Sequence, residues 1–218
     1  MKGIKLALVF AAVASVMMCG CVSGNAADKV EDEYPSLIAD IDSISLGTLT
    51  FHSKSFGKLK QHTFSKVFVE PRYNTVVLRY HDGANFQTVV LKQGARVAVI
   101  DAVLAFAAEW DEHTLQNVKA TAGNAYSKGV MDYSFGIVSP AHSVQNIPFY
   151  MNCIFMEGQP YLVLRIPSKP VKGEEALYSP YTELYFSRTQ AEALAERINQ
   201  EYLESLVQEM TLEKYSYE

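Results

Sequence analysis

The sequence feature that most constrains the fold is an Asp-Gly pair between two runs rich in β-branched residues. The runs are residues 74–80 and 86–91, and residues 81–84, His-Asp-Gly-Ala, separate them. Asp and Gly both tolerate the positive φ angles of tight hairpin turns, so this pattern is a strong local signal for a β-hairpin. We therefore expect two antiparallel strands here, within a mainly antiparallel sheet.

Other short runs of alternating or continuous apolar residues predict further strands. These expected strands cover residues 45–51, 66–70, 130–138, 149–155, 161–166 and 182–186. Pro71 ends the second of them. Residues 156–160 contain Gly and Pro and predict a second hairpin with a longer turn.

Residues 96–112 change to a helical period. The apolar face of this expected helix consists of Val99, Ile100, Val103, Phe106, Ala107 and Trp110. Few polar residues interrupt it, which predicts a helix that is well buried against the sheet.

A second helix is expected at residues 188–211. Ser187 and Gln190 match a capping box, in which each side chain satisfies a backbone amide of the other residue. The expected buried stripe is Ala191, Leu194, Ala195, Ile198, Tyr202, Leu206 and Met210.

Together these elements predict an α+β fold: an antiparallel sheet with two helices packed on one face. We expect a single domain over residues 36–218. Both helices follow a strand and begin with Ala-rich segments, so a duplicated unit of three strands and a helix is one architecture to test. Its halves would be residues 44–122 and 123–218.

The first twenty residues look like an export signal. Lys2 and Lys5 precede an apolar run over residues 6–18 that is shorter than the roughly 20 residues of a membrane-spanning helix. A short apolar run behind a positive start is typical of a secretory signal peptide.

Residues 18–21, Met-Cys-Gly-Cys, resemble the lipobox of bacterial lipoproteins. The resemblance covers the signal peptide alone. It implies cleavage between Gly20 and Cys21 and attachment of fatty acyl chains, such as palmitate, to Cys21. Two or more acyl chains anchor a protein stably on a bilayer. The next residue is Val22 rather than Asp. The resemblance to bacterial lipoproteins therefore implies the outer membrane rather than the inner membrane.

The residues that follow leave a second interpretation open. Residues 24–26, Gly-Asn-Ala, also suit an ordinary signal-peptide cleavage site, which would yield a soluble periplasmic protein. In the lipoprotein interpretation, residues 21–35 form the lipidated N-terminus and a flexible tether. Loss of Cys19 and acylation of Cys21 leave Cys153 without a disulfide partner, so the core alone must hold the fold.

Charge and composition narrow the classes of partner. Removing residues 1–20 takes away Lys2 and Lys5 and changes the formal charge from −5 to −7. Basic residues form no cluster along the sequence, so we expect neither nucleic acid nor an anionic membrane surface as a partner through charge. The chain is 49% hydrophobic, which is enough to build a sizeable core.

No motif in the sequence identifies a catalytic or metal site. Asp82 beside His81 is explained by the turn, and Asp111-Glu112-His113 point in different directions along a helix. Ser55 and Lys58 match Ser-x-x-Lys but lie between strands, without the partner motifs of that enzyme class. Cys153 is expected to be a buried, inert thiol. We predict no cofactor and no metal ligand.

Tyrosine is abundant, with 13 residues, and suits both half-buried strands and binding surfaces. The tyrosines that gather near predicted strands are Tyr126, Tyr133, Tyr150, Tyr178, Tyr181 and Tyr185. We therefore expect a non-catalytic envelope lipoprotein that binds an envelope protein or a glycan. The alternative is a periplasmic, hydrolase-like enzyme whose site is assembled from distant residues. Its candidate residues are His52, His62, His81, His113 and His142.

Overall fold

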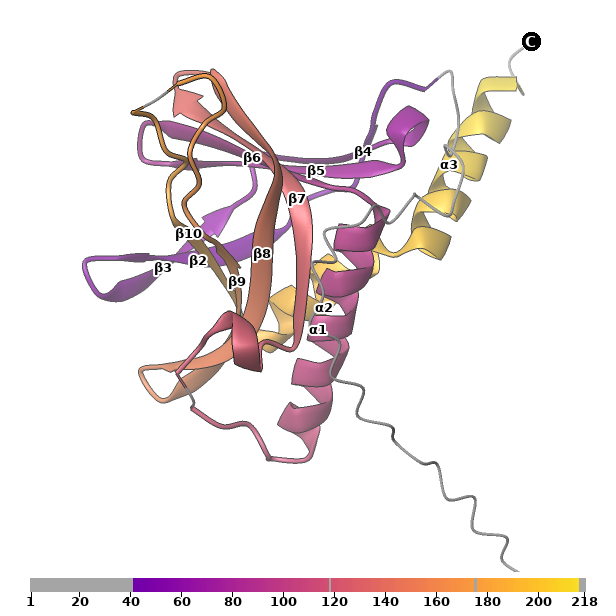
Figure 1. The fold of residues 1–218 in the computed structure, drawn as a ribbon. Coiled ribbons are helices and arrows are strands. Elements are labelled where there is room, and N and C mark those ends of the chain that lie inside the picture. Colours follow the sequence, from indigo (N-terminus) through magenta and orange to yellow (C-terminus); the bar gives the residue numbers. More distant parts are fainter. Residues whose placement is uncertain (1–40, 118, 175, 216–218) are drawn as a thin grey trace, which may run out of the picture. The chain divides into compact units, whose positions relative to one another are not determined.

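The Asp-Gly hairpin lies within a ten-stranded antiparallel sheet, which confirms the predicted α+β class (Figure 1). The computed structural model describes residues 41–117, 119–174 and 176–215, and all of them belong to one compact unit. The predicted signal peptide, Cys21 and the tether lie outside the described residues. No helix within the described ranges is both long and apolar enough to cross a bilayer.

The strands follow one another mostly as hairpins. Their bounds are β1 Ile44–Ser45, β2 Thr50–Ser55, β3 Lys58–Thr63, β4 Lys66–Glu70, β5 Thr75–Asp82, β6 Asn85–Leu91, β7 Ser127–Ile137, β8 His142–Met156, β9 Gln159–Ile166 and β10 Thr182–Phe186. The order in the sheet is β1-β4-β5-β6-β7-β8-β9-β10-β2-β3. The first predicted half thus supplies β1–β6 and the second supplies β7–β10, and an internal repeat stays a prediction.

The two predicted hairpin turns are tighter than expected. Gly83 takes a positive φ of 61°, whereas Asp82 does not, so only the glycine uses its conformational freedom in the first turn. The second turn consists of Glu157 and Gly158 alone, with φ values of 53° and 80°. The prediction of a longer turn over residues 156–160 was wrong because β8 and β9 continue pairing up to Met156 and Gln159.

Residues 45–51, predicted as one strand, instead link opposite ends of the sheet. Strand β1 pairs with β4, and β2 pairs with β10. The five peptide steps from Ser45 to Thr50 span at most about 18 Å. The sheet must therefore coil until its two ends approach each other. Gly47, with a φ of 81°, lies in this connection.

Helix α1, Gln93–Asp111, begins three residues before the expected start and packs on β6, β7 and β8. It is less buried than predicted, because Val97 and Leu104 are exposed on its outer face.

Arg96, near the start of α1, is almost fully buried. Its Nη2 donates hydrogen bonds to Asn74 Oδ1, at 2.9 Å, and to Gln200 Oε1, and so links α1 to the residue before β5 and to the last helix.

The predicted second helix is two helices, α2 Arg188–Ile198 and α3 Gln200–Tyr215. Asn199 between them is extended, and its Oδ1 accepts the amide hydrogens of Glu201 and Tyr202. Asn is a strong N-cap residue, which explains why a new helix starts there. The extended residue shifts the helical phase, so Leu203 and Val207 are the buried positions of α3. The predicted Tyr202 and Leu206 pack against the core only partly buried, and Met210 is exposed.

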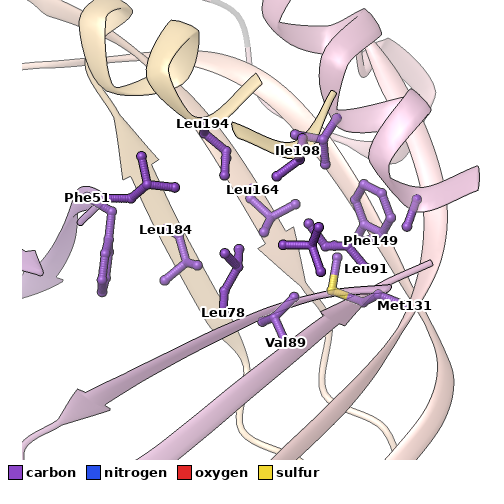
Figure 2. Packing of buried hydrophobic residues seen from close by; sticks show 14 of the residues in the cluster. Phe51, Leu78, Val89, Leu91, Met131, Phe149, Leu164, Leu184, Leu194 and Ile198 are labelled. Atoms are coloured by element: carbon purple, nitrogen blue, oxygen red, sulfur yellow. The ribbon is translucent and has the colours of Figure 1, made fainter. Parts of the chain in front are cut away.

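The core lies between the inner face of the sheet and helices α1 and α2. Figure 2 shows Leu194 and Ile198 of α2 above side chains from β2, β5, β6 and β7–β10, among them Phe51, Leu78, Val89 and Leu164. The capping box of Ser187 and Gln190 is present as predicted at the start of α2. Aromatic contacts of Phe51 with Phe64 and Tyr80 close the core near the hairpin of β2 and β3.

Candidate functional site

An open groove of about 220 Å³ lies where the coiled sheet brings β2 and β3 close to the turn between β5 and β6 and to the start of β10. We call it the polar groove. Its polar lining residues are Ser53, Lys54, His62, His81, Asp82, Asn85, Gln87, Thr182 and Glu183. Phe51, Tyr80, Pro180, Tyr181 and Leu184 complete the lining. Ligand pockets for drug-sized molecules usually exceed 300 Å³, so this groove fits a smaller group.

A buried hydrogen-bond cluster forms the floor of the polar groove. The side-chain carbonyl of Gln87 accepts hydrogen bonds from Tyr80 at 2.6 Å, Tyr133 at 2.5 Å and Thr182 at 3.1 Å. The Tyr133 and Thr182 hydroxyls also lie 3.0 Å apart. Burial raises the pKa of Tyr133 to about 12 and that of Tyr80 well above its ordinary value, so both hydroxyls stay protonated. The cluster gives the groove a fixed floor.

Ser53 and His62 form one wall. In the β2–β3 register His62 is opposite Phe51, so Ser53, two residues further along β2, faces the same side. The His62 ring stacks on Phe51 with centroids 5.5 Å apart, and its Nε2 lies 2.9 Å from Ser53 Oγ. Among the described residues, only Ser53 forms a hydrogen bond with this imidazole.

Glu183 also lines the groove, but it follows Thr182 on β10, so its carboxylate points to the opposite face of the strand, where three donors hold it. Arg165 Nε, 2.6 Å away, and Tyr181 Oη, 2.7 Å away, donate to Oε1, and Tyr185 Oη donates to Oε2 at 2.5 Å. Burial opposes the charge of Glu183, but the bonds from Tyr185, Arg165 and Tyr181 outweigh it and lower the pKa of this carboxyl. Glu183 is therefore ionised at neutral pH. With both oxygens occupied, it is poorly placed to exchange a proton with a ligand.

Two of the five candidate histidines meet in the polar groove, His62 and His81, with Asp82 beside them. His52 lies elsewhere, opposite Tyr185 in the sheet, and its ring contacts Tyr161 edge-on at 5.5 Å. His142 pairs with Glu174 at 2.9 Å. His113 lies past the end of α1 and is exposed.

The other sequence candidates have structural roles. Asp111 receives two hydrogen bonds from Arg188, which lower the pKa of its carboxyl. No group of metal-binding side chains occurs in the part of the chain that the structure describes. Ser55 and Lys58 face each other across a hairpin turn rather than starting a helix. Cys153 is buried within β8, and burial raises the pKa of its thiol to about 11.

The tyrosines divide between core and surface. Tyr181 and Tyr185 converge on Glu183, and Tyr150 contacts the same cluster through Arg165, whose guanidinium lies 5.9 Å from its ring centroid. Tyr133 belongs to the groove floor, and Tyr126 donates to Glu109 at 2.5 Å. Tyr178 is exposed.

Sequence analysis missed Gln87, Ser53 and Glu183 as site residues. A local signal existed for Gln87, because it alternates with Val89 and Leu91 and therefore shares their inward face. A polar residue on a core face needs partners, which here come from three other strands, β5, β7 and β10. Ser53 had no comparable signal, since pairing of β2 with β3 brings its partner close. Tyr181 and Tyr185 are neighbours of Glu183 in the sequence, but its ion-pair partner Arg165 is brought close only by pairing of β9 with β10.

The polar groove offers fixed hydrogen-bonding groups rather than an activated nucleophile. A catalytic Ser-His pair needs a third group that orients the imidazole, and none of the described residues supplies one at His62. The charges of the lining also largely balance: it contains both Lys54 and Asp82, and Arg165 forms an ion pair with Glu183. The arrangement suits an uncharged ligand that both donates and accepts hydrogen bonds.

A protein-family model described as "Uncharacterised Treponema protein" matches residues 23–205. The match includes every residue that lines the polar groove. No curated protein and no solved structure matches the chain.

Proposed function

Since this chain belongs to the family described as an uncharacterised Treponema protein, we propose its function from its own residues. We infer that it is a bacterial envelope lipoprotein that binds a glycan in the polar groove. Acyl chains on Cys21 would hold it on a membrane, with the outer membrane favoured over the inner membrane. The observation that carries the binding proposal is the groove itself, with its fixed polar floor.

The chemistry of the lining favours a sugar over a charged ligand. Each sugar hydroxyl donates and accepts a hydrogen bond, and the lining provides donors from Lys54 and Asn85 and acceptors from Asp82. Tyr181, which is exposed, adds aromatic surface that suits the apolar face of a sugar ring. The volume of about 220 Å³ suits one ring, with the rest of a glycan chain extending out of the open groove.

A hydrolase remains the second candidate, because Ser53 Oγ and His62 Nε2 lie within hydrogen-bond distance at 2.9 Å. The two candidates differ in a single variant. If the protein is a hydrolase, Ser53→Ala should abolish product release. If it is a binding protein, wild type releases no product, and Ser53→Ala keeps most of the affinity for the glycan.

We expect His62→Gln to weaken glycan binding about tenfold, the effect of losing one well-placed polar contact. The measurement is isothermal titration of the chain from residue 21, carrying Cys21→Ser, with N-acetylglucosamine oligomers and other short oligosaccharides. His142→Gln is the matched control, because His142 lies outside the groove and should bind like wild type. The proposal fails if no oligosaccharide binds, or if both histidine variants bind equally well.

For the anchor, we expect cells expressing the full chain to incorporate radioactive palmitate into it, and Cys21→Ser to abolish the label. The same substitution should move the protein from the membrane fraction to the soluble fraction, because acyl chains are the proposed means of attachment. Cys153→Ala serves as the control and should keep the label. Equal labelling of wild type and Cys21→Ser would refute the lipid assignment.

A further inference from the structure

The hairpin between β2 and β3 ends in an exposed phenylalanine in an unfavourable conformation. Phe56 and Gly57 form its two-residue turn, with φ values of 48° and 81°. Asn or Gly normally occupies the first position of such a turn, since a bulky side chain at positive φ is strained. Phe56 is nonetheless 105% exposed, so it gains no burial within the described fold. Folding does not explain its presence.

Lysines flank Phe56 along the sequence, with no acidic residue among them. No Asp or Glu occurs between Asp42 and Glu70, although the whole chain has a net charge of −5. Lys54, Lys58 and Lys60 are exposed, and none of them forms an ion pair with another described residue. The β2–β3 register places Lys54 on one face of the hairpin and Lys58 and Lys60 on the other. The sequence analysis found no basic cluster, but the hairpin assembles one.

The hairpin tip extends beyond the sheet. Strand β3 is the last strand in the sheet order, and β2 pairs with β10 only at His52. Figure 1 shows this hairpin projecting away from the neighbouring strands. Edge-strand lysines can serve merely to block pairing with other chains, but that role does not require an exposed aromatic residue at the tip.

We propose that this tip, defined as Lys54, Phe56, Lys58 and Lys60, contacts an anionic phospholipid surface. The Phe56 ring enters the boundary between headgroups and acyl chains, and the lysines bind lipid phosphates. An exposed aromatic residue among basic ones is the combination that such a surface attracts, through buried apolar area and charge together. The contact is separate from the acyl anchor at Cys21. It shares Lys54 with the polar groove, and the variants below therefore leave Lys54 unchanged.

The test measures partition of the chain from residue 21, carrying Cys21→Ser, onto lipid vesicles. This chain contains the whole compact unit described above. We expect it to sediment with vesicles of phosphatidylcholine and phosphatidylglycerol, weakly with phosphatidylcholine alone, and less at high salt. Phe56→Asn should reduce the partition coefficient about tenfold. Lys58→Gln with Lys60→Gln should reduce it about twentyfold.

Three controls separate the membrane contact from other effects. Lys128→Gln with Lys172→Gln changes the net charge equally at exposed positions away from the tip and should partition like wild type. Phe56→Asn should unfold at no lower temperature than wild type, because Asn tolerates the positive φ better. His62→Gln should partition normally, so that failure of the groove proposal leaves this one standing.

Fluorescence gives an independent result, because Trp110 is the one tryptophan of the chain. The emission of Phe56→Trp should shift to shorter wavelength when anionic vesicles are added, while wild-type emission stays constant. Equal binding to neutral and anionic vesicles would overturn the proposal. The proposal would also be overturned if Phe56→Asn and the Lys58→Gln/Lys60→Gln variant partitioned onto vesicles as well as the Lys128→Gln/Lys172→Gln control. If the wild-type chain does not bind vesicles, the membrane proposal is wrong and a protein partner becomes the explanation for the tip.

Discussion

Replacing Glu183 with alanine is expected to lower the free energy of unfolding by about 3 kcal/mol. The side chain of Arg165 is only 8% exposed, and its Nε lies 2.6 Å from Glu183 Oε1. Removing the carboxylate leaves this cation buried without its counter-charge, and it also removes the acceptor of Tyr181 and Tyr185. Chemical denaturation monitored by circular dichroism measures the loss. Glu174→Ala is the control, because its pair with His142 is exposed and should contribute little.

A double variant and the pH dependence of stability test the same ion-pair explanation. Glu183→Leu combined with Arg165→Met should recover most of the loss, because no charge is then left buried. The pKa of Glu183 is lower in the folded protein than its ordinary value of 4.5. The stability that it contributes is therefore complete above that value and lost as the pH falls through the lowered pKa. The difference between wild type and Glu183→Ala should shrink in acid; a constant difference would contradict the ion-pair explanation.

Replacing Gln87 with leucine is expected to lower the free energy of unfolding by about 2 kcal/mol. Tyr80, Tyr133 and Thr182 share the side-chain carbonyl of Gln87 and would lose that acceptor inside the protein. Tyr133 and Thr182 keep their contact with each other, which limits the loss. Gln61→Leu, at an exposed position of β3, should change stability by less than about 0.5 kcal/mol.

A triple variant distinguishes a lost acceptor from poor packing of the leucine. Gln87→Leu with Tyr80→Phe and Tyr133→Phe removes two of the hydroxyls that the single variant leaves without an acceptor, so it should be more stable than Gln87→Leu alone. If it is less stable, packing rather than hydrogen bonding explains the single variant. The floor also supports the polar groove, so Gln87→Leu should weaken oligosaccharide binding as well.

Elements specified by neighbouring residues were predicted well. Strand β10 has its predicted bounds of 182–186, and the capping box of Ser187 and Gln190 forms as expected. The Asp-Gly hairpin and the strand ending at Pro71 are also present. Each depends on residues within a few positions of one another, where turn, capping and alternation preferences act directly.

Elements that depend on distant pairing were missed. Strand β3 is polar, Lys-Leu-Lys-Gln-His-Thr, and carries little apolar alternation because much of it is exposed at the sheet edge. Its partner β2 was merged with β1, since nothing local indicates that four intervening residues connect opposite ends of a sheet. The break at Asn199 had a local signal, a capping residue, but the continuous apolar pattern around it masked the new helix start.

The candidate site follows the same division. His81 and Asp82 were attributed to a turn, but both belong to the end of β5, and both line the polar groove. Ser53, Gln87 and Glu183 were missed because each becomes part of the groove through residues on other strands. The prediction that Cys21 carries lipid concerns a residue outside the described structure and stays a prediction.

The sequence by itself determined the α+β class, most strand positions and the start of α2, because these depend on local backbone preferences and the alternation of apolar residues. Only the tertiary structure decided which strands became neighbours. Coiling of the sheet joined β2 and β3 to β10, which created the groove, and pairing of two lysine-bearing strands concentrated charge around Phe56. The groove needs contacts between strands distant in the sequence, whose cost in chain entropy is met only when the whole sheet forms.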